Sequence, residues 1–377
     1  MKAMKRPLKD AFVLCLALIY LLMASYGCHK SEDQEDGQNP DSGSTDKSDD
    51  SGGSDSDNDA DADSGYWDPE SWNRPECEND DDCEHGHYCR MGKCLQKCAG
   101  SIIFKDPVLE ALVMEITGKS SGEIKYEDVR HITELDSDDG ISELDGIQCL
   151  ESLNFLRLTG HGCLSDYVRD LEPLADLEEL DRLYLSQNCI EDISPIAGLT
   201  GLVELDLIQN EVNDLRYISN MSGLKKLSIS RYDIEIEEEE LETIAGLTRM
   251  QSLIFNVPGI SSLEFLSGMK DLTSVVIGST QNTISEITPL EDLQDLSVID
   301  IKHTETKDLS PLQNLINISE LDLRWNEIRD LDPLVDNPGI GINDFIDVTN
   351  NPVNCQDQDS NIRTLRRRGV KLLVDCY

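Results

Sequence analysis

The sequence predicts an α/β solenoid, in which short coils stack side by side and share one core. Three observations predict this fold. Similar segments recur from residue 132 to residue 345. Each segment combines a short alternation of apolar and polar residues with a later apolar stretch that often contains proline. Leucine and isoleucine are abundant, whereas aromatic residues make up only 5% of the chain, which suits a long aliphatic core.

The repeat length defines the kind of solenoid. Units that open at Leu180, Leu202 and Leu224 begin 22 residues apart. Later units open at Met250, Leu272, Leu296 and Ile318, and weaker ones open at Ile132 and Leu153. The pattern L-x-x-L-x-L-x-x-N-x-I with a period of about 20–29 residues is typical of leucine-rich repeats. We therefore expect a horseshoe of about eight coils over residues 132–345.

Each part of a coil has a predicted structure. Leu183 and Leu185 alternate with Tyr184, so they point inward from a short strand, and the strands form a parallel sheet on the concave face. Asparagine follows the strand, where its amide can satisfy backbone groups of neighbouring coils. These residues are Asn188, Asn210 and Asn326. Proline on the convex face favours extended or short 3₁₀ segments, at Pro195, Pro289, Pro311 and Pro333.

One unit departs from this pattern. The coil that opens at Leu224 contains the insertion "EIEEEE", and insertions in solenoids form loops that often carry function. We expect Glu235 and Glu237–Glu240 to form a solvated bulge. A site for a cation or a partner is the alternative.

The short period and the recurring phrase D-I/L-x-P-L/I-x-x-L, as in "DISPIAGL" and "DLSPLQNL", resemble the internalin-type leucine-rich repeats of bacterial surface proteins. The resemblance implies a helical N-terminal cap over residues 100–131. It also implies a C-terminal cap over residues 346–377, with a disulfide between Cys355 and Cys376.

Cysteine usage indicates an oxidising compartment, since the chain has twelve cysteines and several are closely spaced. Residues 75–99 are too short to build a hydrophobic core, so disulfides must hold this small module together. Its cysteines are Cys77, Cys83, Cys89, Cys94 and Cys98. Zinc binding by Cys83, His85, His87 and Cys89 is the alternative. An odd number of cysteines means that one of them pairs outside the module.

A second disulfide is expected between coils. Aligning "LRLTGHGCLSDY" with "LYLSQNCIEDIS" places Cys163 beside Cys189 on the next coil. Equivalent positions on adjacent coils lie about 5 Å apart, and a disulfide needs Cα atoms roughly 4.4–6.8 Å apart. We predict a Cys163–Cys189 disulfide, which leaves Cys149 as a partner for Cys98.

The N-terminal 27 residues predict a secretory signal peptide, with a basic start and an apolar run from Ala11 to Met23. The following "SYGC" resembles a lipobox, so we expect lipidation at Cys28. Ordinary cleavage without lipid is the alternative. Residues 28–74 are rich in Asp, Ser and Gly and predict a disordered acidic tether, with a weak calcium site as the alternative.

The formal net charge of −43 argues against nucleic acid and anionic membranes as partners, so we expect membrane contact only through the lipid anchor. The sequence contains no serine elbow, phosphate-binding loop or H-E-x-x-H motif. We therefore expect a monomeric protein that is not an enzyme and needs neither cofactor nor metal.

The concave face is the candidate binding surface, because tryptophan and arginine are frequent interface hot spots. The candidate contact residues are Tyr184, Arg231, Asp300, Lys302, His303, Asp322, Arg324 and Trp325. Trp325 is the expected contact centre, and an ordinary solvated sheet face is the alternative. The predicted function is capture of a protein or peptide at the cell envelope or outer membrane surface. A structural envelope spacer without a specific partner is the second hypothesis.

Overall fold

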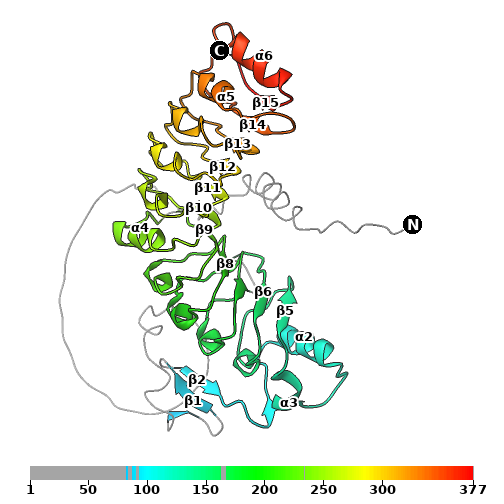
Figure 1. The fold of residues 1–377 in the computed structure, drawn as a ribbon. Coiled ribbons are helices and arrows are strands. Elements are labelled where there is room, and N and C mark those ends of the chain that lie inside the picture. The colour runs from blue at the N-terminus through cyan, green and yellow to red at the C-terminus, as the bar shows by residue number, and fades with distance from the viewer. Residues whose placement is uncertain (1–81, 84–86, 91–92, 163–166, 233, 377) are drawn as a thin grey trace, which may run out of the picture. The chain divides into compact units, whose positions relative to one another are not determined.

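The computed structural model describes residues 82–376 apart from 84–86, 91–92, 163–166 and 233 (Figure 1). The predicted signal peptide and acidic tether, together with Cys28, Cys77, His85 and Cys163, lie outside the described residues. In the part of the chain that the structure describes, no helix combines the length and apolar character needed to span a membrane.

An eleven-stranded parallel sheet runs through the repeats, and each strand pairs with the next one along the chain (Figure 1). This confirms the predicted α/β solenoid. The strands are β5 (Glu134–Ser137), β6 (Phe155–Leu158), β7 (Arg182–Tyr184), β8 (Glu204–Leu207), β9 (Lys226–Ser230), β10 (Ser252–Asn256), β11 (Ser274–Val276), β12 (Val298–Asp300), β13 (Glu320–Asp322), β14 (Phe345–Asp347) and β15 (Lys371–Leu373). The sheet has more strands than the eight coils expected, since nine strands, β5 to β13, precede β14 and β15 at its C-terminal end.

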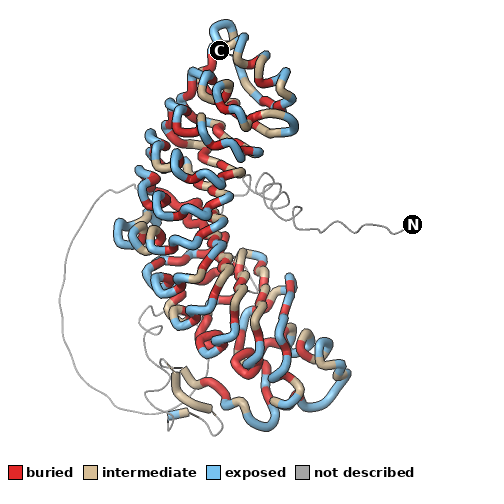
Figure 2. Tube along the Cα trace, in the orientation of Figure 1, coloured by how far each residue is buried: buried red, intermediate tan, exposed pale blue. Residues whose placement is uncertain are grey.

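The core lies behind the sheet, between the strands and the returning segments of each coil (Figure 2). Leu183 and Leu185 are both fully buried, as their alternation predicts. In the sheet register Leu183 pairs with Leu205, which pairs with Leu227. Equivalent leucines of successive coils therefore stack on one another, and the same core continues from coil to coil.

The returning side of the coils consists mostly of short 3₁₀ helices. These are η3 (Ile147–Cys149), η4 (Glu172–Leu174), η5 (Ser194–Gly198), η6 (Arg216–Ile218), η7 (Glu264–Leu266), η8 (Thr288–Leu290) and η9 (Ser310–Leu312). Pro195, Pro289 and Pro311 occupy their first turns, where the missing N–H group has no intrahelical partner to lose. Pro333 instead lies in the first turn of the short α-helix α5 (Asp332–Asp336), which differs from the predicted 3₁₀ segment.

The insertion after β9 matches the expected solvated bulge only in part, since Glu235 and Glu237–Glu239 are exposed but Glu240 is not. Its glutamates start an α-helix, α4 (Glu238–Ala245), and Glu240 is only 2% exposed. Three acidic residues in the first turn of α4 suit the positive end of the helix dipole, which explains why a run of like charges folds as a helix here.

The segment before the repeats contains a two-stranded sheet, β3 (Ser101–Ile102) and β4 (Ile124–Lys125), and two helices, α2 (Pro107–Thr117) and α3 (Tyr126–Val129). Asp106 begins α2, and its Oδ1 atom accepts hydrogen bonds from the backbone N–H groups of Val108 and Leu109. Its Oδ2 atom accepts from Ser142 N at 2.8 Å. Burial alone would raise the pKa of Asp106, but these backbone donors hold the pKa below its ordinary value.

The cysteine-rich segment forms a hairpin of β1 (His87–Arg90) and β2 (Lys93–Gln96). Cys83 is bonded to Cys94, and Cys89 is also disulfide-bonded, so the zinc alternative is wrong. Cys98 is bonded to Cys149, which joins the hairpin to the repeats. Arg90 and Lys93 reinforce this junction. The Arg90 Nε atom lies 3.1 Å from Glu172 Oε1, and Lys93 contacts Asp170.

Two further disulfides involve predicted cysteines. Cys355 is bonded to Cys376 beside α6 (Asp359–Arg367) and β15, at the C-terminal end of the sheet. Cys189 is disulfide-bonded as well. Because Cys163 lies outside the described residues, the Cys163–Cys189 pairing stays a prediction.

Buried asparagines connect the coils through their side-chain amides, as predicted. Asn210 is 2% exposed, donates to Leu185 O at 2.8 Å and accepts from Ile190 N at 3.0 Å, both on the preceding coil. Asn188 and Asn326 make the same kind of contacts. Asn351 continues the series beyond the predicted repeats, since it donates to Leu323 O and accepts from Ile328 N. We call this series the asparagine ladder.

Replacing Asn210 by Ala should lower the free energy of unfolding by about 2–4 kcal/mol, because two buried backbone groups would lose their partner. Urea denaturation measures the loss. Asn317→Ala is the matched control, since Asn317 also bridges coils, through Gln294 O at 2.9 Å, but is exposed. The Asn317→Ala variant should lose less than about 1 kcal/mol of unfolding free energy. Equal losses in the two variants would contradict a special role for the buried ladder.

Candidate functional site

The sheet face that points away from the core, here called the open sheet face, presents two side chains from each strand. The second of these forms a continuous row in register. The row, in strand order from β5 to β15, is Asp136, Arg157, Tyr184, Asp206, Ser228, Ile254, Val276, Asp300, Asp322, Asp347 and Leu373. Neighbouring strands lie about 4.8 Å apart, so this row places side chains from distant parts of the sequence next to one another.

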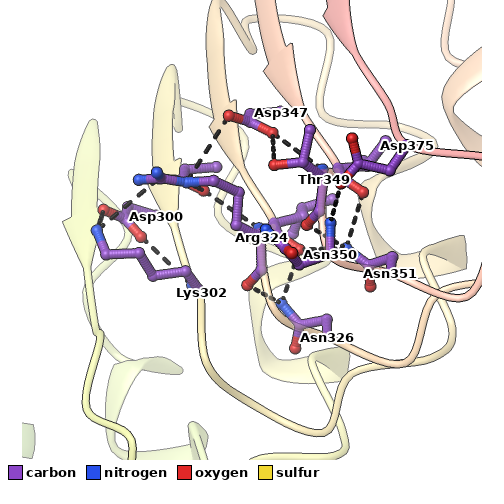
Figure 3. A network of polar contacts seen from close by, with 12 residues as sticks. Asp300, Lys302, Arg324, Asn326, Asp347, Thr349, Asn350, Asn351 and Asp375 are labelled. Carbon is purple, nitrogen blue, oxygen red and sulfur yellow. Dashed lines mark hydrogen bonds and ion pairs between the residues drawn. The ribbon is translucent and has the colours of Figure 1, made fainter.

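The C-terminal part of the row is a charged network (Figure 3). Lys302 pairs with Asp300, and its Nζ atom lies 3.8 Å from Asp322 Oδ2. The Nη2 atom of Arg324 lies 2.7 Å from Asp322 Oδ2, and its Nε atom lies 3.7 Å from Asp347 Oδ2. Cations and carboxylates therefore alternate across β12, β13 and β14, and the network holds four of the predicted contact residues together.

Each carboxylate in this network also organises the backbone that follows its strand. Asp300, Asp322 and Asp347 accept hydrogen bonds from the N–H groups two residues later, at 3.3, 3.2 and 2.9 Å. Burial raises the pKa of Asp300, whereas Lys302 opposes this rise. The network is thus fixed both by ion pairs and by the turns that its own strands form.

His303 and Trp325, both expected on the concave sheet face, do not lie on its strands. The strands β12 and β13 end three residues earlier, and both residues occupy the left-handed backbone region, with φ of 57° and 58°. Their rings stack with centroids 5.5 Å apart and an angle of 9° between the planes. Burial, followed by the charges of Lys302 and Arg324, lowers the pKa of His303 and so favours the neutral imidazole.

The repeat imposes this backbone conformation, because Gln187, Gln209 and Asn350 share it at the equivalent position before a ladder asparagine. Left-handed geometry is uncommon for residues other than glycine and asparagine, and a bulky side chain is unfavourable there. Trp325 is 53% exposed, so core packing does not explain its presence. An exposed tryptophan at a strained position is a reason to consider function.

A shallow hollow of about 390 Å³ adjoins the ring pair. Its lining residues are Thr280, Asn282, His303, Thr304, Glu305, Trp325, Asn326, Glu327 and Asn350. The hollow is open to solvent along the turns that follow β11 to β14. In the described part of the chain, no group of three or more His, Cys, Asp and Glu side chains could hold a metal ion.

Arg231 is wrongly placed among the candidate contact residues. Its side chain is 1% exposed, and its guanidinium donates to both carboxylate oxygens of Glu240, at 2.6 and 3.0 Å. Glu240 also accepts from Leu215 N at 2.8 Å. Arg231 therefore fastens α4 to its coil. The insertion supplies a carboxylate, Glu240, that the regular repeat lacks. The strand pattern contains no sign of this partner, so it wrongly predicted an exposed Arg231.

Tyr184 belongs to a different part of the open sheet face. Its hydroxyl donates to Glu204, which pairs with Lys226 at 2.8 Å, and its ring lies 5.6 Å from that of Phe155. Burial and the hydrogen bond to Glu204 raise the pKa of Tyr184. Six strand spacings, or about 29 Å, separate β7 from β13. Tyr184 and Trp325 therefore do not form one compact site.

Asp206 is the residue that sequence reasoning missed. It stands in the row between Tyr184 and Ser228, and the only hydrogen bond that its side chain makes with the described residues comes from Ile208 N to Oδ1, at 3.0 Å. Among the described residues it has no ion-pair partner. Burial raises the pKa of Asp206 to about 6. An alignment of equivalent positions on successive strands predicts Tyr184 and Ser228 beside Asp206, and neither is a cation.

Replacing Asp206 by Asn should stabilise the protein at pH 7.5 by about 2–3 kcal/mol, since a pKa raised from 3.8 to about 6 makes the ionised form unfavourable in the folded state. In the wild type, the stability that the protonated carboxyl provides is present below pH ~4 and is lost as the pH rises through ~6. The difference between wild type and Asp206→Asn should therefore vanish near pH 4.

Urea titrations of both proteins across this pH range provide the measurement. Asp136→Asn is the control, because Asp136 pairs with Arg157 at 2.6 Å and its removal should not stabilise the fold. An Asp206→Asn variant that gains no stability at pH 7.5 would contradict the proposed desolvation of Asp206.

Comparisons with known proteins agree with this architecture. A family model described as leucine-rich repeats (2 copies) matches residues 178–217. The structure resembles an internalin, InlF, from Listeria monocytogenes, with 22% identity and a TM-score of 0.51, over 72% of this chain and 91% of that one. Internalin C2 of the same organism shares 28% identity, with a TM-score of 0.52, over 62% of this chain and 99% of that one.

A third solved structure, described as the functional domain of InlJ from Listeria monocytogenes and as including a cysteine ladder, is 22% identical. Its TM-score is 0.55, over 74% of this chain and 57% of that chain. No curated protein matches the sequence significantly. The repeat model and these structures show that the fold is a leucine-rich repeat solenoid similar to that of internalins.

Proposed function

We propose that this protein captures a protein or peptide partner through the open sheet face and the turns that follow its strands, with its contact centre at Trp325 in the turn after β13. The observation that carries the proposal is the half-exposed indole, stacked on His303 at a backbone position unfavourable for a large side chain. Tryptophan and arginine are enriched among interface hot spots, and Trp325 lies directly after Arg324.

The surroundings of Trp325 favour binding because they are already ordered. Lys302 and Arg324 are held by Asp300, Asp322 and Asp347, so a partner would meet fixed charges. Preorganised groups lose less conformational freedom on association than mobile side chains do. Binding is also favoured over catalysis, since a shallow hollow along the turns offers no enclosed pocket for oriented catalytic groups.

The disulfides indicate an extracellular protein, because such bonds persist in oxidising environments. We further propose that the chain is exported, processed before Cys28 and lipidated there. Its repeats would then act at the cell envelope or outer membrane surface. An envelope spacer that binds no specific partner is the competing function, and capture experiments separate the two.

Removing the aromatic contact should weaken capture. The partner would first be identified by crosslinking on whole cells and then purified. Trp325→Ala combined with Lys302→Ala should reduce its affinity about thirtyfold or more, since truncating a hot spot costs about 2 kcal/mol and about 1.4 kcal/mol corresponds to tenfold. Calorimetric titration measures the change, and circular dichroism verifies that the variant is folded.

Ile316→Ala is the matched control for this experiment, because Ile316 is equally exposed, at 55%, but lies on the returning side after η9. The Ile316→Ala variant should bind the partner with the same affinity as the wild type. Capture unchanged in the Trp325 and Lys302 variant would place the contact elsewhere. Failure of the wild type to retain any specific partner would favour the spacer.

Intact-mass spectrometry of the protein recovered from cell envelopes tests the proposed anchor. The mass should lack residues 1–27 and include the added lipid, and Cys28→Ser should abolish both the lipid and the membrane association. A mass that matches cleavage without an adduct would reject lipidation and leave an exported soluble protein.

A further inference from the structure

We infer that Asp206 receives a basic side chain of an extended partner segment that lies across strands β8 to β11 of the open sheet face. This inference deepens the proposed binding function and rests on it, because it names the chemistry of the partner at a second point about 24 Å from β13. It concerns a residue outside the charged network around Trp325.

The first observation is that Asp206 is alone among its equivalents. Five aspartates occupy the same row, and the other four are all paired. Asp136 pairs with Arg157, Asp300 with Lys302, and Asp322 and Asp347 share Arg324. The repeat therefore accommodates aspartate in this row by supplying a cation from the chain itself. At Asp206 none of the described residues supplies one, so a cation from outside would complete the same arrangement.

The neighbouring strands explain why neither of their cations pairs with Asp206. On β9, Lys226 is engaged by Glu204, at 2.8 Å. On β7, Arg182 pairs with Asp181 at 3.1 Å and stacks over Phe155. The residues directly beside Asp206 in the row are Tyr184, whose hydroxyl already donates to Glu204, and the short Ser228. One carboxylate oxygen, Oδ2, consequently has no donor among the described residues.

An unpaired, desolvated carboxylate is unfavourable for folding, as its raised pKa indicates. The chain could remove this cost with asparagine, whose side-chain oxygen could still accept from Ile208 N. Groups that lower stability without serving the core are concentrated at functional sites. A guanidinium or ammonium group would convert this unfavourable carboxylate into a charge-assisted hydrogen bond.

The residues that follow Asp206 in the row indicate which second side chain the partner segment presents beside its basic residue. The row continues with three uncharged residues, Ser228, Ile254 and Val276. The next residue, Asp300, is already paired with Lys302. Val276 lies three strand spacings, or about 14 Å, from Asp206. An extended peptide rises about 3.3 Å per residue and presents every second side chain to one face. An apolar residue four positions from the basic one, about 13 Å away, therefore falls over Val276.

A long-range argument also favours a basic segment. The chain has a formal net charge of −43, so cationic segments are attracted and anionic ones repelled before contact. Within the row, the uncharged strip separates Asp206 from the balanced network at β12 to β14. An acidic or phosphorylated segment would meet an unscreened carboxylate at Asp206.

The test uses a designed pair of peptides, acetyl-Gly-Arg-Ala-Val-Ala-Ile-Gly-amide and the same peptide with citrulline in place of arginine. Citrulline keeps the shape of the side chain and removes its charge. Binding to the full chain is measured by NMR titration at pH 7.5 and low salt. The wild type should bind the arginine peptide at least about tenfold more tightly, as expected for a charge-assisted contact worth about 1.5–3 kcal/mol.

Asp206→Asn should bind the two peptides equally, and it keeps the acceptor for Ile208 N. Asp136→Asn, which removes an aspartate already paired with Arg157, should retain the wild-type preference for arginine. Equal binding of both peptides by the wild type, no binding at millimolar peptide, or an arginine preference that survives in Asp206→Asn would each overturn the inference. Loss of partner capture on changing Trp325, together with any of these results, would reject the role of Asp206 and leave the proposed function intact.

Discussion

No coil of this protein can bury its own apolar face, and the rest of the structure depends on that constraint. A single strand of three to five residues and its returning segment enclose too little volume, so each coil completes the core of the one before it. The asparagine ladder meets the same constraint for polar groups, since each amide satisfies backbone atoms that the preceding coil leaves open. The apolar core and the asparagine hydrogen bonds thus both continue from coil to coil along the stack.

This constraint also explains the character of the open sheet face. Because the inward leucines hold every strand and the ladder asparagines join several of the coils, the outward positions do not build the core and are freer to vary. One end of the row carries interleaved ion pairs, the centre is uncharged, and Asp206 stands between the centre and the aromatic cluster of β7. A flat array of fixed positions can therefore present different chemistries to successive parts of an extended partner.

The inward positions could be predicted from the sequence because they follow the period of the repeat. Leu183, Asn210 and Pro311 each have a role that the repeat itself defines. The exceptions depend on contacts that a period does not contain. Arg231 is buried because an inserted helix brings Glu240 to it, and His303 leaves the strand because β12 ends at Asp300. Asp206 required comparison across coils, since its property is the absence of a neighbour that its equivalents possess.

The Cys98–Cys149 disulfide determines how a pulling force is transmitted through the molecule. Its Cα atoms are 5.2 Å apart although 51 positions separate them in sequence. Tension applied to the chain before Cys98 would pass through the covalent bridge into η3, at the start of the repeats, and residues 99–148 would bear almost none of it. The helices α2 and α3, which lie between the two cysteines, are therefore shielded from pulling, and an attached solenoid would resist unfolding from its N-terminal end.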